Sequence, residues 1–189
     1  MTIRKNLLGS IETKLAIANN PELIYQIEAA GNQIINTLIN SGKILIAGNG
    51  GSAADAQHFA AELVGKFMHE NRQALPALAL TTNSSIVTAI GNDFGYEKVF
   101  LRNIEAFGQK GDIFFGISTS GNSRNIINAI HMANHRGLFT IGLLGNNGGK
   151  MKDFCHINIT VPSSNTQHIQ ESHIAIIHSI CQLIDDAFI

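Results

Sequence analysis

The chain has 189 residues, of which 44% are hydrophobic and 14% charged, and its formal net charge at pH 7 is −1. This length suits one domain with a substantial core, and the near-neutral charge excludes the basic stripe of a nucleic-acid-binding protein. No run of about 18 apolar residues occurs, so we expect neither a membrane span nor a membrane partner.

The chain begins with two helical patterns. Apolar residues recur at helical spacing over residues 2–18 and 22–40. Asn20 followed by Pro21 is typical of a helix N-cap with proline at the first helical position. Residues 1–40 therefore form a helical hairpin, which packs either on its own domain or on a neighbouring subunit.

Short apolar runs then alternate with helical patterns. The expected strands are residues 43–48, 77–81, 112–117, 138–144 and 156–161, and the expected helices are 52–67, 84–91, 96–107, 123–136, 147–153 and about 167–187. This alternation predicts an α/β fold in which helices cover a five-stranded parallel sheet, all within a single domain, 1–189. Ligands bind such sheets at the carboxyl ends of the strands, so the loops after the first and third strands are candidate sites.

The loop after the first strand is rich in glycine. Its glycines allow a sharp turn and close approach to a ligand, and Ser52 is the expected N-cap of the next helix. Unpaired N–H groups and the helix dipole make such a turn an anion site. Asp55 is interpreted as a first-turn carboxylate that the dipole favours. His58 and Glu62, four residues apart, project from one helix face as a candidate acid/base or metal pair.

The loop after the third strand is rich in hydroxyl groups. Residues 117–123 read Ile-Ser-Thr-Ser-Gly-Asn-Ser, and a helix is expected to follow. This composition is typical of a phosphate cradle without a lysine, although a hydroxyl-rich capping turn is the alternative. Because both loops end at the same sheet edge, phosphate binding is favoured.

Four segments, residues 48–58, 89–93, 116–123 and 169–173, resemble the SIS (sugar isomerase) family, and within it the phosphoheptose isomerase family. The resemblance covers nearly the whole chain. It implies a flavodoxin-like three-layer fold, a homotetramer with active sites at subunit boundaries, and an aldose–ketose isomerase. The implied reaction converts sedoheptulose 7-phosphate to D-glycero-D-manno-heptose 7-phosphate, a precursor of bacterial lipopolysaccharide or other surface polysaccharide.

The resemblance also implies roles for individual residues. The phosphate would be held by Ser118, Thr119, Ser120 and Ser123, and the sugar by Asn49, Gly50, Gly51, Ser52, Asn92, Asp93 and Gln170. Glu62 matches the catalytic base and His178 the catalytic acid. One zinc ion per subunit would be bound by His58, Glu62, Gln170 and His178. Gln170 and His178 differ by about 80° around an ideal helix, so zinc binding by both requires a displaced or irregular helix start.

The proposed chemistry agrees with these residue types. Interconversion of a ketose and an aldose removes a proton from the carbon beside a carbonyl, which suits a carboxylate of raised pKa. A histidine or a metal ion can stabilise the enediolate oxygen, and the phosphate supplies remote binding energy. His173 is interpreted as a core or interface histidine. Lys66 stands where many relatives have arginine, so its role is open.

Two other functions fit most of these motifs: a non-catalytic SIS protein that binds the bacterial replication initiator, and a sugar-phosphate-sensing module. A binding-only protein need not keep both Glu62 and His178, so their presence favours the enzyme. Residues 1–10 contain no apolar signal segment, and Cys155 and Cys181 lie far apart. We therefore expect a cytoplasmic protein with reduced cysteines.

Overall fold

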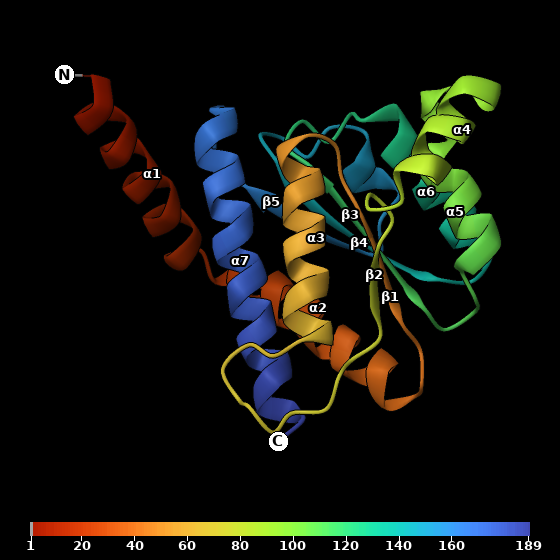
Figure 1. Cartoon of the computed structure of the whole chain (residues 1–189). Coiled ribbons are helices and arrows are strands. Elements are labelled where there is room, and N and C mark those ends of the chain that lie inside the picture. Colours follow the sequence, from red (N-terminus) through yellow and green to blue (C-terminus); the bar gives the residue numbers. More distant parts are fainter. Residues whose placement is uncertain (1) are drawn as a thin grey trace.

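The computed structural model describes residues 2–189 and contains one sheet between two layers of helices (Figure 1). The strands lie in the order β2 (Ala77–Ala79), β1 (Ile44–Ala47), β3 (Ile113–Ser118), β4 (Phe139–Gly145) and β5 (Ile157–Val161), and every neighbouring pair is parallel. The predicted five-stranded parallel sheet is confirmed. Its strand order is the flavodoxin-like one. From β1 the chain adds β2 on one side and then β3, β4 and β5 on the other side, so the topological switch point lies between β1 and β3.

Each face of the sheet has its own hydrophobic core. One core contains Ile44 and Ile46, and the other contains Leu45, because successive residues of a strand point to opposite faces. The first face is covered by α2 (Pro21–Ile39), α3 (Gly51–Val64) and α7 (Thr166–Ala187). The second face is covered by α4 (Ser84–Phe94), α5 (Val99–Phe107) and α6 (Arg124–His135). Burial on both faces explains why the strands are apolar throughout.

The predicted N-terminal hairpin has two unequal helices. Asn20 caps α2 by accepting a 3.2 Å hydrogen bond from the Leu23 amide, with Pro21 at the first turn, as the sequence predicts. The apolar face of α2 is buried in the first core. In contrast, α1 (Thr2–Ala18) stands outside α7 (Figure 1), and several of its large apolar side chains are between 47% and 78% exposed: Ile3, Leu7, Leu8, Ile11 and Leu15.

Two predicted helices differ in the structure. Residues 147–153 form only a 3₁₀ turn, η2 (Met151–Asp153), because Gly148 and Gly149 have φ values of 83° and 54°, which a right-handed helix does not admit. The predicted helix 96–107 is divided into a 3₁₀ turn, η1 (Tyr96–Lys98), and α5. Within residues 2–189, no helix combines the length and apolar character needed to cross a bilayer.

Candidate active site

The glycine-rich turn joins β1 to α3. Gly50, with φ 57° and ψ −121°, is the N-cap of α3, so the prediction that Ser52 caps this helix is wrong. The left-handed φ of Gly50 turns the chain before Ser52, which is buried inside the first turn. Gly48 permits this tight path, because a Cβ there would stand 2.3 Å from the Ser52 carbonyl oxygen. Asp55 also lies beyond the first turn, which contains no acidic residue, so its predicted dipole role is wrong as well.

The hydroxyl-rich loop gathers its serines at the N-terminus of α6. Ser118 ends β3, and its Oγ lies 2.9 Å from Ser123 Oγ and 3.5 Å from Ser120 Oγ. Ser123 is the N-cap of α6, yet its side chain makes no capping hydrogen bond to the helix backbone. Thr119 is half-buried and Ser120 is exposed. Clustered hydroxyls beside a helix N-terminus are suited to binding a phosphate.

A network of amides ties these two loops together. The side chains of Asn49 and Asn125 exchange hydrogen bonds of 2.9 Å and 2.8 Å, and the Tyr96 hydroxyl donates to Asn49 Oδ1 at 3.0 Å. Asn49 precedes α3 and Asn125 lies in the first turn of α6, so both loops meet at one sheet edge as predicted. Asn125 and Tyr96 were not identified from the sequence, although Asn125 directly follows the serine loop.

The candidate acid/base residues meet where α3 packs against α7. Nε2 of His58 lies 2.9 Å from Nε2 of His178 and 3.3 Å from Oε1 of Glu62. The predicted proximity of His58 and Glu62 is thus confirmed, and His178 joins them from a distant part of the chain. The side chains of His58 and Glu62 are 42% and 21% exposed, so a substrate can reach them. One imidazole must donate to the other, which places a transferable proton beside a carboxylate.

Gln170, Asn92 and Asp93 lie apart from this cluster. A Cβ at Gly51 would stand 1.9 Å from Gln170 Nε2, so the Gln170 side chain covers the start of α3. Since α7 is a regular helix from Thr166, the irregular start that joint zinc binding would require is absent. Asn92 and Asp93 are exposed on α4 and hydrogen-bond to each other at 2.8 Å. Across residues 2–189, no three His, Cys, Asp or Glu side chains converge as a metal-binding group.

Asp55 has an environment that the sequence did not predict. It is only 8% exposed, and its Oδ2 has no hydrogen-bond partner. Burial raises the pKa of Asp55 to about 6, and the positive field of nearby His58 partly offsets this rise. It lines a cavity of about 490 Å³ together with Gln170. The spacing of Asp55, three residues after Ser52 and four before Phe59 on the buried side of α3, was the available sequence signal.

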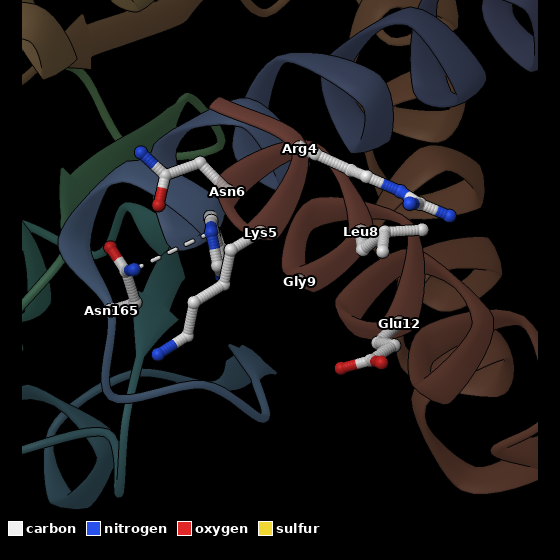
Figure 2. A pocket seen from close by; sticks show the side chains of 8 residues that line it. Arg4, Lys5, Asn6, Leu8, Gly9, Glu12 and Asn165 are labelled. Atoms are coloured by element: carbon white, nitrogen blue, oxygen red, sulfur yellow. Dashed lines mark hydrogen bonds between the residues drawn. The ribbon is translucent and has the colours of Figure 1, made fainter. Parts of the chain in front are cut away.

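A cavity of about 520 Å³ lies elsewhere, between α1 and the start of α7 (Figure 2). Arg4, Lys5 and Glu12 of α1 line one side, and Asn165, which hydrogen-bonds to His168 at 3.4 Å, lines the other. None of the site residues predicted from the sequence lines it.

Comparisons with known proteins identify the family of this chain. A sequence model of the SIS domain family matches residues 14–145. The phosphoheptose isomerase of Aliarcobacter butzleri is 57% identical over 85% of this chain and 84% of its own length. The phosphoheptose isomerase of Aneurinibacillus thermoaerophilus is 52% identical over 98% of this chain and 93% of its own length.

A solved structure extends the similarity to three dimensions. The phosphoheptose isomerase of Neisseria gonorrhoeae superimposes with a TM-score of 0.92 at 42% identity, covering 98% of this chain and 97% of that one. Sequence identity and fold agree. The chain therefore belongs to the SIS domain family and, within it, to the phosphoheptose isomerases.

Proposed function

We propose that this protein converts sedoheptulose 7-phosphate to D-glycero-D-manno-heptose 7-phosphate, which supplies heptose for bacterial surface polysaccharide such as lipopolysaccharide. The observation that carries the proposal is the cluster of His58, Glu62 and His178, with contacts of 2.9 Å and 3.3 Å. A carboxylate and an imidazole in one cluster are the groups that an aldose–ketose proton transfer needs. The serine loop provides a separate site for the phosphate.

In this mechanism each group has one task. Glu62 removes the proton from the carbon beside the carbonyl and returns it to the neighbouring carbon. His178 exchanges a proton with the carbonyl oxygen, and the adjacent His58 keeps the His178 ring oriented through the 2.9 Å contact. Ser118, Thr119, Ser120 and Ser123 hold the phosphate, whose binding energy aligns the reacting carbons. Asn49, Gly50, Gly51 and Ser52, with Gln170 and the pair Asn92 and Asp93, contact the sugar.

Part of the expected zinc set suits the ion. His58, Glu62 and His178 offer two imidazole nitrogens and a carboxylate oxygen, a donor set that zinc accepts. Gln170, the fourth residue of that set, covers Gly51 instead and does not join the other three. Among residues 2–189 these three side chains do not already converge as a metal-binding group. We therefore infer that they would hold the ion only after their side chains rearrange, and that the bound ion would polarise the substrate carbonyl as a Lewis acid. Elemental analysis of the purified protein and of His58→Ala tests this, because zinc content should fall in the variant.

The length of α3 between the glycine-rich turn and Glu62 supports a shared site. Glu62 lies about three turns along α3 from Gly51, which is ~16 Å of helix rise. This exceeds the span of an extended seven-carbon sugar. We therefore infer that the serine loop of one subunit faces the cluster of another, within a homotetramer. The exposed apolar side chains of α1 are available for that assembly. Both cysteines are unpaired, which is compatible with the reducing cytoplasm.

The direct test is an isomerase assay with sedoheptulose 7-phosphate. The wild-type protein should form the aldoheptose 7-phosphate, and Glu62→Gln should lower kcat by about 10²-fold or more, because it removes the proton acceptor while keeping the side-chain volume. Glu105→Gln is a suitable control, since Glu105 lies on α5 and pairs with Arg102. A wild-type protein that binds the sugar phosphate but never isomerises it would instead favour the sensing function.

A further inference from the structure

Arg72 is a buried cation at the C-terminal end of α3. Its side chain is 1% exposed. Nη2 donates to the carbonyl oxygens of Glu62 at 2.7 Å and Gly65 at 3.3 Å, and Nη1 donates to the Leu63 carbonyl at 2.9 Å. The last carbonyls of a helix lack partners within the helix, so Arg72 satisfies the final turn of α3. One of these carbonyls belongs to Glu62 itself.

Asp185 of α7 completes the arrangement from the opposite side. Its Oδ1 accepts a hydrogen bond from Nε of Arg72, and its Oδ2 accepts from the amides of Met68 at 2.8 Å and His69 at 2.9 Å. Its side chain is also 1% exposed. Burial acts to raise the pKa of Asp185, but the two amides and the Arg72 guanidinium outweigh burial and lower it. The carboxylate therefore stays ionised opposite Arg72.

These contacts connect both halves of the acid/base cluster. Asp185 lies about two turns beyond His178 on the same face of α7. Phe67, next to the anchored Met68 amide, places its ring 5.8 Å from the His178 ring. Arg72 thus holds the turn of α3 that carries Glu62, while Asp185 holds the segment that packs on His178.

We propose that Arg72 and Asp185 are positioning residues for isomerisation, because they fix the separation between Glu62 on α3 and His178 on α7. The proposal rests on the catalytic roles given to Glu62 and His178 above. Buried ion pairs contribute little net stability compared with apolar packing, so a purely stabilising role would be a weak reason for this pair. Small displacements of a catalytic group cost far more in turnover than in binding.

The structure offers a closely matched control. Asp112 accepts hydrogen bonds from the amides of Lys43 at 3.0 Å and Gln109 at 2.8 Å, and pairs with Lys43 Nζ at 2.6 Å. Its side chain is 4% exposed. Like Asp185, it is a buried carboxylate with two amide donors and one cation. It lies at the start of β3, the end of the sheet opposite the serine loop.

The experiment compares Asp185→Asn and Arg72→Lys with Asp112→Asn, measuring melting temperature, kcat and KM for sedoheptulose 7-phosphate. We expect kcat to fall by about 10- to 100-fold in the first two variants, with KM changed by no more than about threefold because the phosphate loop is untouched. Asp112→Asn should lower the melting temperature comparably and keep the wild-type kcat. If Asp185→Asn does not fold, Arg72→Lys decides, since it retains the buried positive charge.

Wild-type kcat in folded Asp185→Asn or Arg72→Lys would overturn the proposal, as would an equal loss of kcat in Asp112→Asn. Glu62→Gln is assayed alongside, so that failure of the proposed function can be told apart from failure of the positioning role of Arg72 and Asp185. If Glu62→Gln is inactive and the wild type is active, normal turnover in Asp185→Asn and Arg72→Lys refutes the positioning role and leaves the proposed function standing. If Glu62→Gln stays active, the proposed function and the positioning role fail together.

Discussion

At the scale of single residues, His173 shows how burial controls a titratable group. It is fully buried on α7, its Nε2 contacts the Leu144 carbonyl oxygen at 2.9 Å, and its Nδ1 has no partner. Because Leu144 offers only an acceptor, Nε2 carries the hydrogen. Burial lowers the pKa of His173 to about 4, and the hydrogen bond to Leu144 opposes this shift only in part. The predicted core role of His173 is confirmed.

His173 should make the protein sensitive to acid. The pKa of His173 is about 4 in the folded state and 6.5 in the unfolded state. Its contribution to the free energy of unfolding is therefore complete above pH 6.5 and is lost as the pH falls through 4. The loss should be on the order of 3 kcal/mol. Urea unfolding at pH 7 and pH 4 measures it, by comparing the wild type with His173→Gln. The opposite pH dependence of Asp55 cancels in this comparison. If the free energy of unfolding falls equally between pH 7 and pH 4 in the wild type and in His173→Gln, the prediction is contradicted.

Ser120 provides a test of the phosphate loop. Its exposed Oγ accepts from the Asn122 amide at 3.2 Å, so removing it leaves the fold largely unaltered. A hydrogen bond to a charged group contributes about 1.5–3 kcal/mol, so Ser120→Ala should raise KM by about 10- to 100-fold with little change in kcat. The same steady-state assay should find the dephosphorylated sugar a poor substrate. Similar kcat/KM values with and without the phosphate would refute the role of this loop.

At the scale of elements, the serine loop is held in place by the loop after β4. Gly121 has φ 63°, and a Cβ there would stand 1.9 Å from the Gly148 carbonyl oxygen. The Met151 amide also donates to the Gly121 carbonyl at 2.9 Å. Residues 147–153, which do not form the predicted helix, therefore pack against the candidate phosphate site. Gly148 and Gly149 have positive φ values, and they allow the backbone of the serine loop to approach closely.

This close contact predicts different outcomes for two glycine substitutions. Gly121→Ala must displace the serine loop, so KM should rise by about tenfold or more, while stability falls by about 1–3 kcal/mol. Gly111→Ala is the control, because Gly111 also has a positive φ, 94°, but nothing lies within 4 Å of its added Cβ. It should lose stability without a change in KM. Kinetics and thermal melting on both variants measure this, and unchanged KM in Gly121→Ala would count against the loop's role.

At the scale of the whole molecule, the proposed homotetramer predicts which inactive subunits can complement each other. Glu62 and His178 contact the same His58 within one chain, whereas the glycine-rich turn, which Asn49 joins to the start of α6, lies about three turns of α3 from Glu62. A site shared between chains therefore needs the serine loop of one subunit and the acid/base cluster of another. Variants within one cluster cannot restore each other.

Mixed oligomers test this arrangement. Ser120→Asp, which repels the phosphate, and Glu62→Gln should each be inactive alone. Refolded together in equal amounts, they should recover about a quarter of wild-type activity, since random assembly gives that share of sites with both intact parts. A mixture of Glu62→Gln with His178→Ala should recover none. Activity in a monomer by sedimentation, or no recovery in the first mixture, would contradict the shared site.

The sequence by itself determined the features that depend on neighbouring residues. Helical periodicity located most helices to within a few residues, because side-chain direction repeats with the backbone. Short continuous apolar runs located the strands, because both faces of a parallel sheet are buried. The four-residue spacing of His58 and Glu62 placed them together for the same reason. The order of β1 and β3 brought the glycine and serine loops to one edge.

Only the tertiary structure decided which distant faces meet. Arg72 and Asp185 are 113 positions apart, and no local pattern connects them. Gln170 covers Gly51 rather than joining His178, because α7 stays regular and its two ends face different parts of α3. Asp55 is buried because α7 packs over its side of α3. Backbone periodicity sets what lies on a helix face, but the partner of that face depends on how separate elements pack.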